Sequence, residues 1–315
     1  MTAEVIDGRK IAQSLKADVA REILQLAADG MPCGLATLAV GHDYGAASYQ
    51  RRLERTAGEL SVPYRHIALA DASQPDEVRA AIGDLNADPS VTGIVVLRPL
   101  PRHVPEADVF CALAPVKDIE AVHPQNAGLL ALGTPRYVPS TPAAVFHLLD
   151  AWLDSAGEDR ADFYHRSLIT VVGRSNNVGK PAVSLAYDRE AAVESVDAWA
   201  SRAGRLGWHT RRADVLIVAA GSPGLIRSEH IRADAVVLDV GINRSVDSAT
   251  GEDRMVGDVL FSDAVARARA VTPVPGGVGP VTDVWLIRNT AAAARNQAAG
   301  HRNAAGLQNS GQVAR

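Results

Sequence analysis

The sequence predicts an α/β protein made of two domains with parallel sheets. Apolar stretches of strand length alternate with segments of helical apolar spacing along most of the 315 residues, the pattern that produces parallel sheets. A polar stretch over 154–166 interrupts this alternation. A chain of this length can bury two cores. We therefore expect one domain over 1–145 and a second over 146–280.

Composition excludes several classes of protein. The net charge is −4, hydrophobic residues make up 47% of the chain and mean hydropathy is near zero, which is typical of a soluble globular protein. With four Phe and six Tyr on an acidic chain, no nucleic acid partner is expected. The start carries no basic region followed by an apolar stretch, and no apolar run of about 18 residues occurs, so we expect a cytoplasmic protein without a membrane segment.

The two cysteines indicate neither a metal nor a disulfide. Cys33 and Cys111 lack metal-ligand spacing and the framework of a small secreted domain. They are interpreted as buried thiols, and no metal is expected.

The first domain begins with a helix over 9–29, where apolar residues recur at helical spacing. Strands and helices then alternate as in a parallel sheet. The expected strands are 34–40, 64–69 and 93–97, and the further helices are 47–60, 75–87 and 142–153. The loops after the third strand, from 99 to 126, lie where open α/β sheets place their binding clefts.

The second domain begins with a strand over 168–172 that runs into a glycine turn and a helix. This arrangement receives a dinucleotide pyrophosphate at the helix N-terminus. The turn departs from GxGxxG, because Ser175 stands at the second glycine and Gly179 lies one residue late. Further strands over 192–196, 214–219 and 235–240 favour a Rossmann-type sheet. A structural parallel sheet with glycine turns remains the alternative.

A run of three glycines and three prolines between Thr272 and Pro280 is the most unusual segment of the chain. Proline fixes φ and glycine lets the main chain approach a ligand, so the run is interpreted as a backbone wall against a flat substrate or cofactor ring. The alternative is a tight connector to a helix starting near Val281. Residues 298–315 are expected to be a disordered tail.

Short motifs in a fixed order carry a family resemblance over residues 3–295. They are Asp7-Gly8, Gly41 through Tyr49, Gly93–Val96 with Pro99–Pro101, Lys117-Asp118, His123-Pro124 with Asn126 and Gly128, Thr141-Pro142, Gly173–Ser175, Asp239–Asn243, Val256–Val259 and Pro275–Pro280. The chain resembles the bifunctional methylenetetrahydrofolate dehydrogenase/methenyltetrahydrofolate cyclohydrolase family.

The resemblance implies a fold, two reactions and a cofactor. The fold is an N-terminal α/β catalytic domain plus a C-terminal Rossmann dinucleotide-binding domain, with a folate cleft between them and a last helix over 281–297 that returns to the first domain. The first reaction moves hydride from 5,10-methylenetetrahydrofolate to NADP or NAD. The second hydrolyses the methenyl product to 10-formyltetrahydrofolate. Family members are usually homodimers.

Two departures from the family pattern fall on the hydrolytic step. The family's Tyr-x-x-x-Lys motif reads Tyr49 and then Leu53, and its Val-Gln-Leu-Pro stretch carries Leu97 at the glutamine. Leucine exchanges no protons, so we predict that cyclohydrolase activity is lost or very weak. The alternatives are a paralogue oxidising a different folate, pterin or iminium substrate, and a non-catalytic folate or dinucleotide-binding protein.

The substrate residues follow from the resemblance. Tyr49 is expected to stack on the folate, against the alternative of a half-buried helix tyrosine. Glu120, where the family has aspartate, is expected to grip the pterin. Arg52 and Arg98 flank the two leucines and are interpreted either as solvated surface residues or as groups gripping a substrate carboxylate, and His123 as structural rather than a base. The expected substrate-binding residues are Tyr49, Arg52, Val96, Leu97, Arg98, Glu120, Pro275, Gly276 and Gly277.

The sequence leaves the choice of cofactor open. Asp197 ends the second Rossmann strand, where an acid would bond a ribose diol and favour NAD, whereas Arg174 in the glycine turn suits a phosphate. The PGGVGP run is followed by Val281-Thr282-Asp283, where the family usually has Met-Thr and an apolar residue. The expected cofactor-binding residues are Gly173, Arg174, Ser175, Val178, Gly179, Asp197, Gly221, Ile242, Gly279 and Thr282.

Overall fold

The computed structural model describes residues 2–246 and 253–312 and divides into two compact units. We call them the six-stranded unit and the three-stranded unit after their main sheets. The first comprises Met1–Leu15, Ala131–Thr134 and Pro139–Trp285, and the second comprises Lys16–Leu130, Pro135–Val138 and Leu286–Arg315. The division falls inside two helices, α1 (Gly8–Ala28) and α12 (Val278–Gln312).

The six-stranded unit is a doubly wound parallel sheet, which confirms the predicted α/β class. Its order is β1-β11-β8-β7-β5-β6, and every neighbouring pair is parallel. The strands are β1 (Glu4–Val5), β5 (Leu168–Val172), β6 (Ala192–Val196), β7 (Val215–Val218), β8 (Val236–Asp239) and β11 (Ala270–Val271). Because the order reverses between β5 and β7, the loops after these strands bound the crevice where such sheets bind ligands.

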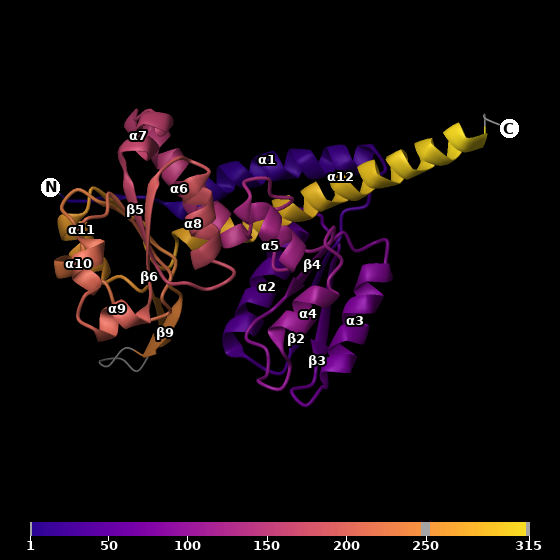
Figure 1. The fold of residues 1–315 in the computed structure, drawn as a ribbon, viewed down its shortest axis with the longest axis horizontal. Coiled ribbons are helices and arrows are strands. Elements are labelled where there is room, and N and C mark those ends of the chain that lie inside the picture. Colours follow the sequence, from indigo (N-terminus) through magenta and orange to yellow (C-terminus); the bar gives the residue numbers. More distant parts are fainter. Residues whose placement is uncertain (1, 247–252, 313–315) are drawn as a thin grey trace. The chain divides into compact units, whose positions relative to one another are not determined.

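Helices and one hairpin complete this unit (Figure 1). The helices are α6 (Ser140–Ala156), α7 (Arg160–Arg166), α8 (Gly179–Tyr187), α9 (Ala198–Arg202), α10 (Leu206–Thr210), α11 (Phe261–Arg267) and the 3-10 turn η1 (Ser228–His230). The hairpin pairs β9 (Asn243–Val246) with β10 (Asp253–Val256) in antiparallel register.

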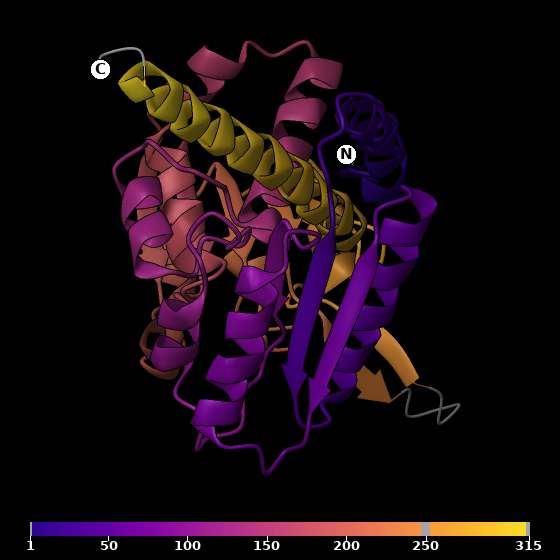
Figure 2. The same cartoon turned by 90° about the vertical axis from the view of Figure 1, so that its right-hand side faces the viewer.

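The three-stranded unit has the parallel order β3-β2-β4. Its strands are β2 (Leu35–Val40), β3 (Tyr64–Leu69) and β4 (Gly93–Val96), and its helices are α2 (Tyr44–Glu59), α3 (Pro75–Ala87), α4 (Glu106–Ala112) and α5 (Pro124–Ala131). Leu38 and Ile94 join Ile82 of α3 and Phe110 of α4 in one apolar core, while α2 packs on the sheet as well. The strands therefore lie between helices (Figure 2).

Three features differ from the sequence expectations. Helix α12 begins at Val278 rather than near Val281, because Pro280 is tolerated in a first helical turn. The expected tail 298–315 is helical to Gln312, and 313–315 lie outside the described residues. The interpretation of both cysteines as buried was wrong for Cys111, which is exposed, whereas Cys33 is partly buried. No helix in the described part of the chain combines the length and apolar composition that a membrane crossing requires.

Candidate active site

The glycine turn after β5 is closed tightly around its own backbone. A Cβ at Gly173, whose φ is +121°, would lie 2.1 Å from the Ala219 carbonyl oxygen, and one at Gly179 would lie 2.1 Å from the Gly173 carbonyl oxygen. Ser175 Oγ accepts hydrogen bonds from the backbone N–H of Val178 (3.2 Å) and of Gly179 (3.3 Å). The imperfect glycine motif therefore forms a tight strand-to-helix turn that presents the N-terminus of α8.

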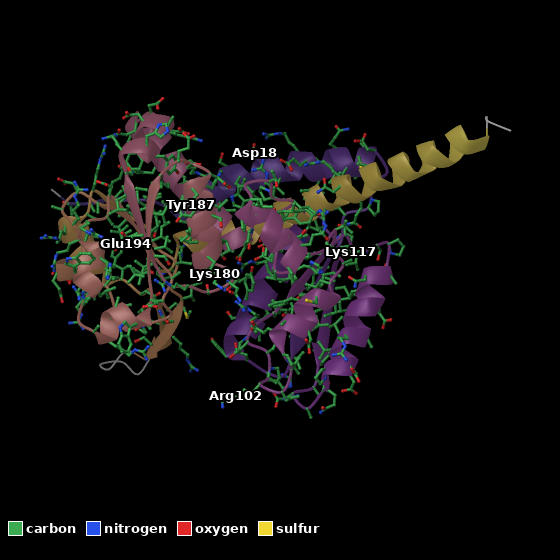
Figure 3. The ribbon with its side chains drawn as sticks, viewed as in Figure 1. Asp18, Arg102, Lys117, Lys180, Tyr187 and Glu194 are labelled. Carbon is green, nitrogen blue, oxygen red and sulfur yellow. The ribbon has the colours of Figure 1, made fainter. Side chains whose placement is uncertain are left out.

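The first turn of α8 is suited to an anion. Backbone N–H groups and the helix dipole favour negative charge at a helix N-terminus. Lys180 lies in this turn (Figure 3) and its Nζ donates to Asn176 Oδ1 over 2.7 Å. The turn stands next to the switch between β5 and β7, so its geometry fits the pyrophosphate of a dinucleotide.

Arg174 and Asp197 form an ion pair at the carboxyl end of β6. Arg174 Nη1 lies 3.0 Å from Asp197 Oδ2, its Nη2 donates to the Ser195 carbonyl oxygen over 2.7 Å, and its Nε donates to Ser195 Oγ over 3.2 Å. Both charged side chains are about half exposed. The two residues that the sequence assigned to opposite cofactor preferences thus contact each other.

Two aspartates organise the loops at the carboxyl edge of the six-stranded sheet. Asp258 accepts from the N–H of Ala220, Gly221 and Ser222 at 2.6–2.8 Å and from Asn243 Nδ2 at 2.8 Å. Asp239, at the end of β8, accepts from the N–H of Gly241, Asp258 and Val259 at 2.9–3.1 Å. Burial raises the pKa of the Asp239 carboxyl to about 7, although these N–H donors lower it.

The PGGVGP run packs its glycines against other backbone. A Cβ at Gly8 would lie 1.8 Å from the Gly277 carbonyl oxygen, and Gly276 has a φ of +112°. Only glycine allows such contacts. Thr282 is buried and its Oγ1 donates to the Val278 carbonyl oxygen over 3.1 Å, whereas Ile242 is 52% exposed. Of these two predicted cofactor residues, Ile242 is the accessible one.

The two leucines at the family's polar positions are buried in the three-stranded unit. Leu53 of α2 is 0% exposed and Leu97, just after β4, is 3% exposed. Leu97 also lines an open pocket of about 330 Å³ under the start of α2, together with Ala39, Gln50 and His66. Both positions where the family pattern has a proton-handling pair, one on α2 and one just after β4, therefore carry buried apolar side chains.

The arginines that flank these leucines contact aromatic rings. The Arg52 Cζ lies 5.2 Å from the centre of the half-buried Tyr49 ring. Arg98 Nη1 pairs with Glu106 Oε2 at 2.8 Å, and its Cζ lies 6.0 Å from the centre of the Phe110 ring. Phe110 belongs to the α3 and α4 side of the sheet. Arg98 and Leu97 thus point to opposite faces, as strand alternation predicts.

The loop that carries Glu120 is fixed by buried polar groups. Asp118 accepts from the N–H of Val122 and His123 and from Asn126 Nδ2 at 2.8–3.1 Å. Burial raises the pKa of the Asp118 carboxyl. Glu120 is partly buried and precedes Ala121, whose φ is +51°. The conformation of this loop therefore sets the direction of Glu120.

One side chain of the last helix supports the same loop. Asn289 Nδ2 donates to the carbonyl oxygens of Ile119 (2.9 Å) and Val138 (2.7 Å). Lys117 is structural, because its Nζ donates to the carbonyl oxygens of Leu85 (3.2 Å) and Asp88 (2.7 Å), and burial lowers its pKa.

The sequence motifs indicated the site residues but not the side chains that hold them in place. Ser195, Asp258 and Asn289 hold Arg174, Gly221 and the Glu120 loop respectively. Asp258 lies in a motif that supported the resemblance, yet no periodicity assigned it a role. The described residues contain no group of three or more metal-ligating side chains arranged around a common point.

Both parts of the chain match models of one family. Residues 6–120 match the tetrahydrofolate dehydrogenase/cyclohydrolase catalytic domain, and residues 139–298 match the NAD(P)-binding domain of the same family. The chain is 56% identical over 313 residues to bifunctional protein FolD 2 of Rubrobacter xylanophilus, covering 98% of each chain. It is 41% identical to bifunctional protein FolD of Salinibacter ruber, covering 94% of this chain and 97% of the relative.

Solved structures of FolD enzymes share the fold. The Trypanosoma brucei enzyme, complexed with NADP cofactor and inhibitor, gives a TM-score of 0.85 at 30% identity and covers 95% of this chain and 99% of its own. The Campylobacter jejuni enzyme gives 0.83 at 31% identity, covering 94% and 99%. With its glycine turn, its proline-glycine run and both family domains in order, the chain belongs to the tetrahydrofolate dehydrogenase/cyclohydrolase family.

Proposed function

We propose that this protein oxidises 5,10-methylenetetrahydrofolate to 5,10-methenyltetrahydrofolate with NAD(P)+, and that the cyclohydrolase step is lost or very weak. The single observation that carries the second part is the burial of Leu53 and Leu97, at 0% and 3% exposure, where the family pattern has lysine and glutamine. Family membership supports the first part.

The two reactions demand different groups from the protein. Hydride transfer depends mainly on positioning, which binding residues provide. Hydrolysis also needs proton transfer to and from water and a folate nitrogen. Leucine has no titratable atom, so neither Leu53 nor Leu97 can hold or move a proton. An amide or ammonium left unpaired in a dry site would cost about 1 to 3 kcal/mol, which supports the joint loss of both polar groups.

The remaining residues bind and orient the reactants in this proposal. Tyr49 stacks on the folate ring system and Glu120 accepts from the amino and ring N–H donors of the pterin. Gly173, Ser175 and the N-terminus of α8 hold the pyrophosphate. Bound NAD(P)+ supplies the hydride acceptor. The main chain of Gly276 and Gly277 provides a flat wall without side chains.

An assay that follows three products separately tests the proposal. Purified protein is mixed with 5,10-methylenetetrahydrofolate and either cofactor, and reduced nicotinamide, methenyl-folate and 10-formyl-folate are measured separately. We expect methenyl-folate to accumulate in step with reduced nicotinamide. A second reaction starts from methenyl-folate, with and without protein, to subtract uncatalysed hydrolysis. Formyl product formed at a rate comparable to the hydride step would refute the loss of cyclohydrolase activity.

A homodimer and a cytoplasmic location belong to the same proposal, supported by the family resemblance and the composition. Sedimentation velocity of the full chain should give a single species of twice the monomer mass. A monomer at working concentration would contradict the dimer.

A further inference from the structure

We infer that this protein prefers NAD+ to NADP+, and that the Asp197 carboxylate sets this preference by excluding the adenosine 2′-phosphate. The inference rests on the proposed function only for the use of a nicotinamide dinucleotide. Asp197 directly follows β6, the strand beside β5 at the edge of the doubly wound sheet. An acid at this point of such a sheet bonds a ribose hydroxyl and disfavours a phosphate there.

The Asp197 carboxylate is fixed by both of its oxygens. Oδ1 accepts from the N–H of Trp199 (3.0 Å) and Ala200 (3.4 Å), which makes Asp197 the N-cap of α9. Oδ2 pairs with Arg174 Nη1 at 3.0 Å. Because the local backbone and the guanidinium both hold it, the carboxylate cannot turn away from an arriving phosphate without losing these bonds.

Arg174 is committed to the protein. Three of its N–H donors go to Asp197 Oδ2, Ser195 Oγ and the Ser195 carbonyl oxygen, at 2.7–3.2 Å. Bidentate binding of a phosphate needs two parallel donors. Two of the five guanidinium N–H donors, one on each Nη, stay available, but a phosphate that accepted them would place about −1.5 to −2 charges next to the Asp197 carboxylate that the same guanidinium holds. The pair therefore neutralises itself rather than attracting an anion.

One positively charged side chain of the surrounding pocket, Arg205, would favour NADP+ instead. A cavity of about 270 Å³ is lined by Arg174, Ser195, Val196, Asp197, Trp199, Ala200, Ala203, Arg205 and His209. Glu194 on β6 (Figure 3) pairs with His209 and with Arg212. Among the described residues, Arg205 forms no ion pair, and it is the side chain that would favour a phosphate. We expect the fixed Asp197 carboxylate, whose charge opposes a phosphate, to outweigh the attraction of Arg205, because Arg174 already binds Asp197 and Ser195.

Titration calorimetry of the full chain with NAD+ and with NADP+, in the absence of folate, tests the inference. We expect NAD+ to bind at least about tenfold more tightly. Asp197→Ser removes the charge but keeps an N-cap side chain for α9, so the ratio of the two Kd values should shift by about tenfold or more toward NADP+. Adding Arg174→Gln should remove that gain, because the released guanidinium is its source.

Asp162→Ser is the matched control, since Asp162 is an exposed acid on α7 whose ion pair is with Arg166, and it should leave both Kd values unchanged. Thermal melts check folding, and Asp197→Asn replaces the serine variant if that variant unfolds. Equal or tighter binding of NADP+ to the natural chain, or an unchanged ratio in folded Asp197 variants, overturns the inference. A clear NAD+ preference without oxidation of methylene-folate would instead sustain the inference and refute the proposed function.

Discussion

The glycine turn after β5 and the α2-facing side of the three-stranded sheet have kept different parts of the family pattern. In the turn, Ser175 stands at the second glycine of the general GxGxxG pattern, yet Gly173 and Gly179 still make backbone contacts that admit no Cβ. Leu53 on α2 and Leu97 just after β4 are buried where the family pattern has lysine and glutamine, while Tyr49 of the same helix matches the family's tyrosine.

The difference teaches which physical demand each region meets. The turn provides shape and dipole, and any residue that preserves the backbone path preserves both. Leucine at both of the other positions brings no titratable group and leaves no buried polar group unsatisfied. Substitutions in the two regions can therefore separate the effect of backbone geometry from the effect of proton-handling side chains.

The largest effect is expected from Gly173→Ala. Its Cβ would meet the Ala219 carbonyl oxygen at 2.1 Å, at a φ of +121°. Overpacking and backbone strain should together cost about 2 to 5 kcal/mol of folding free energy, and dinucleotide binding should weaken by more than about 100-fold (a factor of ten per 1.4 kcal/mol). Gly83→Ala, where a Cβ would meet nothing within 4 Å, is the control. Equal binding by both variants would show that the turn does not hold the cofactor.

Next in size is the restoration of the polar pair. Leu53→Lys alone buries an ammonium at a site with 0% exposure, so unfolding free energy should fall by about 2 to 4 kcal/mol. Leu53→Lys with Leu97→Gln should recover part of that loss and raise formyl-folate production by about 100-fold or more. Leu53→Met, which conserves volume, should cost less than about 1.5 kcal/mol. A folded double variant that hydrolyses no methenyl-folate would mean that lysine and glutamine at these two positions are not sufficient for hydrolysis.

Asp239 should give the free energy of unfolding a pH dependence of intermediate size. Its pKa in the folded protein is about 7, above its ordinary value of 3.8, so the folded state binds this proton more tightly than the unfolded chain does. Its contribution to stability is complete below pH 3.8 and is lost as pH rises through about 7. Urea melts of the natural chain and Asp239→Asn, taken between pH 5 and 8, should show a flatter pH dependence in the variant.

The same substitution should lower stability at pH 8, because an amide N–H₂ would face the N–H of Gly241, Asp258 or Val259. An unsatisfied buried donor costs about 1 to 3 kcal/mol. If the variant keeps the full pH slope of the natural chain, another buried group is responsible for it.

The smallest effect concerns Ala121, whose φ is +51°. Glycine adopts this conformation without strain, but it also raises the entropy of the unfolded chain. Ala121→Gly should therefore stabilise the protein by no more than about 1 kcal/mol, measured by thermal melts. A destabilised variant would indicate that the alanine methyl group packs productively beside Glu120.

Local sequence patterns predicted the helices and strands well, but they did not predict which side chains bind one another. The strands 64–69, 168–172 and 192–196 were predicted to their ends, because apolar runs there are bounded by turn residues. The start of α12 was not predicted correctly, because Pro280 suits both a connector and a first helical turn. Asp258 holds a loop that lies 36–38 residues earlier in the chain, and no spacing rule reaches that far. The Arg174–Asp197 pair joins residues 23 positions apart, which no local spacing pattern predicts.

The two hydrogen bonds of Asn289 affect the order in which the two units can complete their folding during synthesis. Ile119 and Asn289 stand 170 residues apart, so the loop that carries Glu120 lacks one of its supports until α12 leaves the ribosome. Domains generally fold as they are synthesised, at about 5 to 20 residues per second. The three-stranded unit, whose three strands are translated before β5, is therefore the unit that is completed last. A nascent chain without α12 should form the three-stranded sheet but fail to bind folate.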